Sequence, residues 1–469
     1  LFDWLKKVFS REELIILVII VGAALLLRIV VTIPGLGDLP DHFSRPDTPG
    51  YVRPALGLAA GWGYAEPGSA VLETSRPPGF PMFLAFFFSL LGETYLLPVL
   101  TLCLLGALTC VPVFLVGRYF GGSRIGYLAA ALLACNLTAV VNSPMLLSDT
   151  LYGFVTAWQL FFFTRFYFKR EARFFIFAML LAGLGTLIRP IGSAWLIPGL
   201  FLCFIQPEIK LAGKIKIAAL GACAFLVVIA PWMTRNKLIG AGFSIVSNTG
   251  SMYHQNGAML LSKVNGTSYE AEKQKILKEL DKTFADHEKY PDIASRQQYR
   301  VNKFKELILK HPIAYFSMHF RPAALLPDAS RFFELLGLTS GGRGTLDVIH
   351  KKGIIAGVKH YFGDRIWLLF LLLPALIIPA VTYVGCLMQL VIWVCRKKVY
   401  LVFFFLAFVE YFFFLPGPIT VPRYQIPALP LMVVMAAISI WSGYIWALDY
   451  YQRKRNNQLS EELIKSNTV

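Results

Sequence analysis

Charge is scarce in this sequence. Asp, Glu, Lys and Arg together make up 16% of its residues, whereas hydrophobic residues make up 56%, and the mean hydropathy is +0.58. A single soluble core cannot bury so large an apolar share, which excludes a soluble globular fold. Apolar runs such as residues 14–33 and 366–394 reach the ~20 residues that a helix needs to cross a bilayer. The composition therefore predicts an all-α polytopic membrane protein.

Cysteine is missing from the long polar segments of the chain. All seven cysteines lie within or at the ends of apolar runs, which argues against a disulfide framework and against a zinc site made of thiolates. The seven histidines show no recognisable metal-ligand spacing either. We therefore predict no metal-binding residues from these two residue types.

Acidic residues are few as well: 28 Asp and Glu against 45 Lys and Arg give a formal net charge of +17. In a soluble protein this excess would suggest nucleic-acid binding, but here the basic residues lie in alternate short connections between apolar runs. Short basic connections stay on the cytoplasmic side, so we expect both termini there, an even number of spans and no nucleic-acid partner. The basic positions are Lys6, Lys7, Arg11, Arg118, Arg124, Arg165, Lys169, Arg170, Arg173, Lys210, Lys214, Lys216, Arg396, Lys397, Lys398, Arg453, Lys454 and Arg455.

About ten transmembrane helices are expected, with two long segments between them on the outer face. The first outer segment, residues 34–93, lies within an N-terminal membrane module of residues 1–234. The second, residues 235–364, precedes the C-terminal membrane helices and a basic cytoplasmic tail, residues 365–469. The expected spans lie near residues 13–33, 94–118, 124–141, 146–168, 173–189, 191–206, 213–234, 366–395, 399–416 and 427–448.

Both outer segments contain helical patterns that do not suit a membrane span. Residues 52–60 and 80–91 are only about a dozen residues long or shorter, which favours helices lying along the membrane interface. In the second segment, Ile276, Leu277 and Leu280 recur at helical spacing among Lys and Glu, as is typical of an amphipathic helix facing water.

Three polar strings at the predicted outer face contain residues suited to catalysis. Asp47 lies among prolines and glycine in SRPDTPGY (residues 44–51), although most such loop aspartates have no catalytic role. Arg76 precedes a rigid turn in SRPPGFP (residues 75–81); its planar guanidinium suits a lipid phosphate, or it only extends to lipid headgroups. Asp149, near the outer end of the fourth expected span, is costly at that depth unless paired or used, and helix capping explains it equally well.

The order of these strings resembles the GT-C superfamily of glycosyltransferases that use polyprenyl-phosphate sugars. The shared features are an outer-loop Asp followed by a Tyr, then an RPPGFP turn, then Ser-Asp at the start of a later span. The resemblance is strongest to the branch of the lipid A aminoarabinose transferases and the bacterial protein O-mannosyltransferase-like enzymes. It extends over most of the chain through LIRP at 187–190, PWMTRN at 231–236 and PRYQIP at 422–427.

The resemblance implies a GT-C-like fold and an inverting transfer of a sugar from a polyprenyl-phosphate donor to a lipid, glycan or protein acceptor on the outer face. Asp47 matches the family's essential carboxylate and is the expected general base, because a hydroxyl is a poor nucleophile until a base takes its proton. Arginines would stabilise the negative charge on the departing phosphate. The implied site residues are Asp47 and Asp149 for catalysis, Arg76, Arg235, Arg189 and Arg423 for the donor phosphate, and Tyr51, Glu73 and Asp41 for substrate binding.

One departure from the family pattern concerns the first motif, where many relatives have two adjacent acidic residues. Here Pro46 and Thr48 flank Asp47, so no cofactor is firmly implied and a divalent cation is left open. Asp41 and Glu73 are nearby acidic side chains that could take a second role, and Asp41 could replace Asp47 as the base.

Two other function classes stay open. A transporter or flippase of lipid-linked sugars would distribute polar residues through the spans, whereas here they gather at the outer ends; a noncatalytic subunit of a membrane complex would keep the fold as a scaffold. For the enzyme, the expected partners are the lipid-linked donor, the acceptor and membrane lipids, in a bacterial inner (plasma) membrane.

Overall fold

The computed structural model describes residues 9–466, except residues 249, 320–325, 336, 338–347, 349–351, 364, 415 and 418–420. Within these ranges the regular structure is helical, apart from one isolated β-bridge between Ala65 and Leu72. The all-α prediction is therefore confirmed. Lys6 and Lys7 of the predicted cytoplasmic series lie outside the described residues.

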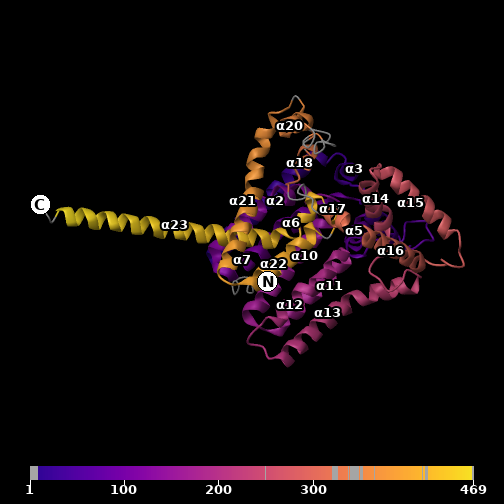
Figure 1. Cartoon of the computed structure of the whole chain (residues 1–469), viewed down its shortest axis with the longest axis horizontal. Helices are drawn as coiled ribbons and strands as arrows, with labels where there is room; N and C mark the ends of the chain where they lie inside the picture. The colour runs from indigo at the N-terminus through magenta and orange to yellow at the C-terminus, as the bar shows by residue number, and fades with distance from the viewer. Residues whose placement is uncertain are drawn as a thin grey trace.

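Apolar helices form the body of the molecule (Figure 1). Among the described residues, five helical stretches are long and apolar enough to cross a membrane. They are α2 (Arg11–Thr32) with η1 (Ile33–Gly35), α6 (Leu96–Leu108) with α7 (Cys110–Gly121), α13 (Leu211–Leu238), α21 (Leu368–Cys395) and α23 (Leu429–Ser466). Shorter helices at other expected spans are α8 (Ser123–Ala134), α10 (Asp149–Lys169), α11 (Ala172–Ile188), η2 (Pro190–Trp195) with α12 (Leu196–Phe204), and α22 (Val399–Phe413).

The span expected near residues 124–141 is divided into two helices. After α8, Asn136 begins the short helix α9 (Leu137–Asn142), because its side chain accepts a hydrogen bond from the Ala139 backbone N–H at 3.1 Å. The hydropathy of this stretch does not distinguish an internal cap from a continuous span. The number of spans, like the domain boundaries, stays a prediction.

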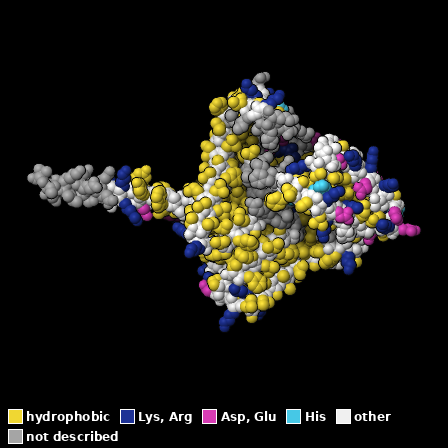
Figure 2. All heavy atoms as spheres, viewed as in Figure 1, with side chains coloured by type: hydrophobic (Ala, Val, Ile, Leu, Met, Phe, Trp, Pro, Cys, Tyr) yellow, Lys and Arg dark blue, Asp and Glu magenta, His cyan; other side chains and the backbone are white. Residues whose placement is uncertain are grey.

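The membrane helices pack in neighbouring pairs, chiefly α7 with α8, α10 with α11, α11 with α13, and α21 with α23. Small residues permit the closest approach: a Cβ atom on Gly117 of α7 would lie 2.9 Å from the Gly126 Cα of α8. Figure 2 shows hydrophobic side chains over much of the face that these helices form, as a lipid-facing surface requires. Charged side chains gather instead at the ends of the molecule.

The two long segments fold at one end of the bundle, which we call the loop end. The first contains α3 (Leu39–Phe43), α4 (Pro49–Ala59) and α5 (Gly79–Leu91), so helices form where interfacial helices are expected. The second contains η3 (Tyr253–Gly257), α14 (Ala258–Asn265), α15 (Tyr269–Phe284), α16 (Ile293–Lys310), α17 (Pro312–His319), α18 (Ala329–Leu335) and α20 (Ile354–Phe362). Ile276 and Leu280 of α15 are buried with Phe304 of α16, which confirms the predicted amphipathic helix.

Candidate active site

Three arginines and two aspartates from distant parts of the sequence meet at the loop end. Arg76 Nη2 donates to Asp47 Oδ1, and Arg423 Nη2 donates to Asp47 Oδ2, both at 2.7 Å. Arg189 Nη1 donates to Asp149 Oδ1, and Arg423 Nη1 lies 3.7 Å from Asp149 Oδ2. We call these residues the charge cluster. Its three guanidinium groups and two carboxylates leave one positive charge in excess.

Asp47 is fixed by the turn that starts α4. Buried Thr48 accepts a hydrogen bond from the Arg45 backbone N–H and donates one to the Leu146 carbonyl at 3.1 Å. Residue 146 belongs to the connection that leads into α10 and Asp149. The turn and the start of α10 are therefore joined, which brings the two aspartates to the same place although about a hundred residues separate them.

Arg76 reaches the cluster because α5 begins against the end of α11. A Cβ atom on Gly79 would lie only 2.7 Å from the Leu187 carbonyl oxygen, so a larger residue would push the two elements apart. The Tyr64 hydroxyl donates to the Arg76 carbonyl at 3.0 Å and holds the preceding turn. Arg189 lies two residues after Leu187, at the C-terminal end of α11, and the RPPG string thus sets Arg76 beside it.

Two tyrosine rings support the guanidinium groups. The ring of Tyr51 lies 5.0 Å from the guanidinium carbon of Arg76, and the Tyr51 hydroxyl is 3.2 Å from Ser148 Oγ. The ring of Tyr424 lies 5.3 Å from Arg189 and 5.7 Å from Arg423. Tyr51 is buried, and its ring lies against Arg76. Tyr424 was not among the predicted residues; its only signal was its place directly after Arg423.

The two carboxylates have different surroundings. The side chain of Asp47 is 38% exposed, whereas that of Asp149 is 3% exposed. Burial acts to raise the pKa of Asp47, but the hydrogen bond from Arg423 and the charge and hydrogen bond of Arg76 outweigh it, so the pKa of Asp47 lies below its ordinary value. Asp47 is therefore ionised and both of its oxygens accept hydrogen bonds from arginine.

Three predicted site residues do not join the charge cluster. Arg235 Nη1 donates to the Glu73 carbonyl at 2.7 Å and to Asn236 Oδ1 at 2.9 Å, so Arg235 holds the loop that leads to Arg76. The carboxylate of Glu73 accepts the Ser75 backbone N–H. Asp41 is exposed on α3. Spacing along the chain did not distinguish these residues from those that converge.

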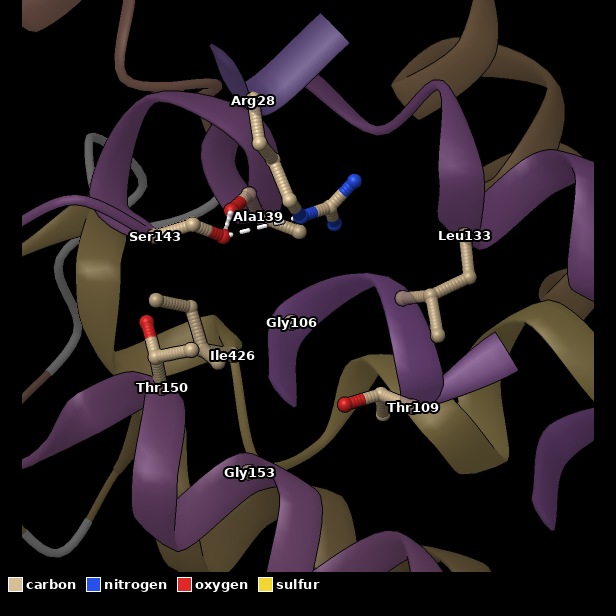
Figure 3. A pocket seen from close by; sticks show the side chains of 9 residues that line it. All are labelled: Arg28, Gly106, Thr109, Leu133, Ala139, Ser143, Thr150, Gly153 and Ile426. Carbon is tan, nitrogen blue, oxygen red and sulfur yellow. Dashed lines mark hydrogen bonds between the residues drawn. The ribbon is translucent and has the colours of Figure 1, made fainter. Parts of the chain in front are cut away.

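A small cavity of about 20 Å³ lies within the bundle (Figure 3). Thr150 and Ile426, which line it, follow Asp149 and Arg423 closely in the sequence. Arg28 of α2 borders the same cavity, is 1% exposed and donates to Ser143 Oγ at 3.0 Å and to the Ala24 carbonyl at 2.8 Å. It also donates to the Ala134 carbonyl at 3.4 Å, and all three of these acceptors are neutral groups.

No metal-binding site is preformed in the part of the chain that the structure describes. There, no set of three or more His, Cys, Asp or Glu side chains is arranged to hold an ion. In the charge cluster, Asp47 and Asp149 bind guanidinium groups.

Comparison with known proteins identifies the fold. Residues 75–234 match the family model described as dolichyl-phosphate-mannose-protein mannosyltransferase, a stretch that contains Arg76, Asp149 and Arg189. The archaeal oligosaccharyltransferase AglB from Archaeoglobus fulgidus, in complex with an inhibitory peptide and a dolichol-phosphate, is similar with a TM-score of 0.52, at 13% identity, over 97% of this chain and 52% of its own. The chain has the GT-C fold.

The apo form of the Archaeoglobus fulgidus oligosaccharyltransferase gives the same result, with a TM-score of 0.54 at 15% identity over 95% of this chain and 52% of its own. The chain thus spans about half the length of these two structures. ArnT from Cupriavidus metallidurans bound to undecaprenyl phosphate has a TM-score of 0.41 at 16% identity, over 90% of this chain and 76% of its own. No curated protein matches in sequence. The GT-C fold and the apolar helices make this chain an integral membrane protein.

Proposed function

We propose that the protein is an inverting glycosyltransferase that moves a sugar from a polyprenyl-phosphate donor to a lipid, glycan or protein acceptor on the outer face of a bacterial inner membrane. The observation that carries this proposal is the charge cluster, in which a partly exposed carboxylate lies among arginines at one end of a GT-C bundle. The family match to dolichyl-phosphate-mannose enzymes and the dolichol-phosphate bound to AglB support the same donor chemistry.

The arginines of the charge cluster suit the donor phosphate. Arg76 and Arg423 are 27% and 17% exposed and present planar donors that bind phosphate oxygens in pairs. The donor is a phosphodiester with one negative charge, whereas the departing polyprenyl phosphate is a monoester that gains a second. The excess positive charge of the cluster therefore stabilises the transition state more than the bound donor, which is the condition for catalysis.

An apolar seam that leads away from the cluster suits the polyprenyl tail. It runs between η2–α12, which begins directly after Arg189, and α22, which packs against α12. Trp195 and Phe408 lie across the seam with ring centroids 4.0 Å apart. Further along, a cavity of about 50 Å³ with an apolar lining is bordered by Leu202 and Phe404 among other residues. We place the first isoprenoid units along this seam.

Asp47 acts as the general base. The acceptor oxygen or nitrogen attacks the anomeric carbon from the face opposite the phosphate, the bond from that carbon to the phosphate oxygen breaks, and the acceptor's proton passes to Asp47. In the structure both oxygens of Asp47 accept hydrogen bonds from arginines. The donor phosphate competes for the same guanidinium groups, so its binding releases Asp47 for proton transfer.

Asp149 positions the arginines rather than reacting. Its side chain is 3% exposed and accepts a hydrogen bond from Arg189, so an acceptor does not reach it. Its charge holds Arg189, and it lies 3.7 Å from Arg423 Nη1, whose Nη2 donates to Asp47. This role replaces the catalytic one expected for Asp149 from the sequence.

The test is transfer by the purified protein in lipid nanodiscs, supplied with polyprenyl-phosphate sugars and membrane acceptors. We expect a covalent sugar adduct by mass spectrometry, lost in Asp47→Asn and retained in the matched control Asp41→Asn, which changes an exposed aspartate of the same segment. In sealed liposomes, movement of the donor between leaflets without an adduct would identify a transporter. Loss of transfer in Asp41→Asn alone would make Asp41 the base.

A further inference from the structure

Helix α18 from the second long segment reaches the part of the chain that carries Asp47. Arg45, two residues before Asp47, donates through Nη2 to Glu334 Oε2 of α18 at 2.7 Å. Arg331, one turn earlier on α18, donates through Nη1 to the same oxygen at 3.0 Å. We call these three residues the Glu334 cluster. It joins positions that are 289 residues apart and is separate from the charge cluster.

Arg331 also binds both chain segments that lead to the aspartates. Its Nη2 donates to the His42 carbonyl at 2.7 Å and contacts Met145 Sδ at 2.8 Å. The Arg331 side chain is 7% exposed, and burial lowers its pKa to about 10, so it stays charged at neutral pH. Phe333 and Leu335 of α18 are fully buried in the same apolar core as Phe43.

A second set of contacts ties the start of α18 to the stretch before Asp149. Asn142 Nδ2 donates to Asp328 Oδ2 at 3.0 Å, and the Asp328 backbone N–H donates to Thr138 Oγ1 at 3.1 Å. The segment from Asp328 to Glu334 therefore contacts both residues 42–45 and residues 138–145. These two stretches lead directly into the two aspartates of the charge cluster.

The loop that carries Arg76 is held by other residues. Thr74 is bound to Ser247 both through the Ser247 backbone N–H, at 2.8 Å, and between the two hydroxyl groups. Arg235 holds the Glu73 carbonyl from α13. The Arg76 and Asp47 side chains are bonded to each other, but the contacts that α18 makes near Asp47 and those that hold the Arg76 loop come from different parts of the second long segment. The backbone near Asp47 can therefore be disturbed while the backbone of the Arg76 loop keeps its own contacts.

We propose that Arg331 and Glu334 of α18 are positioning residues that keep Asp47 in line with the acceptor during sugar transfer. The carboxylate of Glu334 pairs with two guanidinium groups and offsets their mutual repulsion, so without its charge Arg45 and Arg331 repel each other more strongly and move the Asp47 turn. The expected effect of α18 on sugar transfer rests on the proposed function. The contact between α18 and the turn is itself independent of that function.

The experiment compares wild-type protein with Glu334→Gln in nanodiscs by hydrogen–deuterium exchange and by steady-state transfer. We expect faster exchange in residues 42–49, no change in residues 64–76, and a kcat lowered about ten- to a hundredfold by the displaced base, with the donor KM kept within about twofold. The matched control is Glu306→Gln, which breaks an exposed ion pair with Lys303 on α16 and should change neither readout.

Arg45→Met supplies a second route if Glu334→Gln does not fold, since the Arg45 side chain is 32% exposed. The double variant Arg45→Met/Glu334→Gln should be no slower than Glu334→Gln alone, because Glu334→Gln already removes the ion pair with Arg45. Unchanged exchange in residues 42–49, or equal acceleration in residues 64–76, would overturn the positioning role. If the wild-type protein transfers no sugar, the proposed function fails, and the exchange arm still decides whether α18 holds the turn.

Discussion

The charge cluster contains two aspartates whose surroundings differ sharply. Asp47 is 38% exposed and lies between Arg76 and Arg423, whereas Asp149 is 3% exposed and lies between Arg189 and Arg423. Only the first can meet a molecule arriving from water. The sequence predicted a catalytic role for both; under the proposed function the exposed Asp47 reacts and the buried Asp149 organises its neighbours.

Arg423 lies between the two aspartates and contacts both of them. Its Nη2 donates to Asp47 at 2.7 Å, while its Nη1 is 3.7 Å from Asp149. A phosphate that binds Arg76 and Arg423 would displace the exposed carboxylate and leave the buried one in place. In this proposal the phosphate breaks the ion pairs of Asp47 and leaves those of Asp149 intact.

The largest expected effect is that of Asp47→Asn on transfer. Without a base the acceptor keeps its proton as the bond forms, so turnover should fall about 10²- to 10⁴-fold. The amide keeps the size of the side chain, and thermal unfolding should stay close to wild type. Turnover within a few-fold of wild type would remove Asp47 from the proton transfer.

Asp149→Asn should act chiefly on stability. It leaves the buried guanidinium of Arg189 without its carboxylate, and breaking a buried pair in this way costs about 3–5 kcal/mol. We expect a clear drop in Tm in detergent, compared with Asp41→Asn as the exposed control. A normal Tm combined with a complete loss of turnover would instead indicate that Asp149 takes part directly in catalysis.

The arginines allow a matched comparison between Arg76→Met and Arg235→Met. Loss of a charge-assisted contact to phosphate should raise the donor KM about tenfold or more at Arg76. Arg235 holds the Glu73 carbonyl instead, so its variant should lower Tm with little change in donor KM. A larger KM effect at Arg235 would move the phosphate site to that side of the loop.

The smallest effect concerns pH. The pKa of Asp47 is lowered in the free protein, so its ion pairs persist through mildly acidic pH and are lost only as the pH falls through that lowered value. Once phosphate takes its arginines, the pKa of Asp47 should rise. The acid limb of kcat, which reports the donor complex, should therefore lie at higher pH than the acid limb of kcat/KM. If the acid limbs of kcat and kcat/KM lay at the same pH, the phosphate would not compete with Asp47 for the arginines.

The apolar runs of the sequence predicted most membrane helices because hydropathy over ~20 residues is a property of the chain alone. The division at Asn136 was missed since it depends on one side-chain hydrogen bond. Asp47, Arg76, Asp149, Arg189 and Arg423 were all named from motifs, but their convergence could not be deduced from spacing, and Arg235 was grouped with them. The Glu334 cluster had no sequence signal, because contacts across 289 residues leave no local pattern.

The affinity of polyprenyl phosphate for wild-type protein and Asp47→Asn, measured side by side in nanodiscs, tests the competition between carboxylate and phosphate most directly. Because the amide no longer occupies Arg76 and Arg423 as an anion, the account predicts that the inactive variant binds the lipid phosphate more tightly than the active protein. Equal or weaker binding by Asp47→Asn would contradict a shared arginine site.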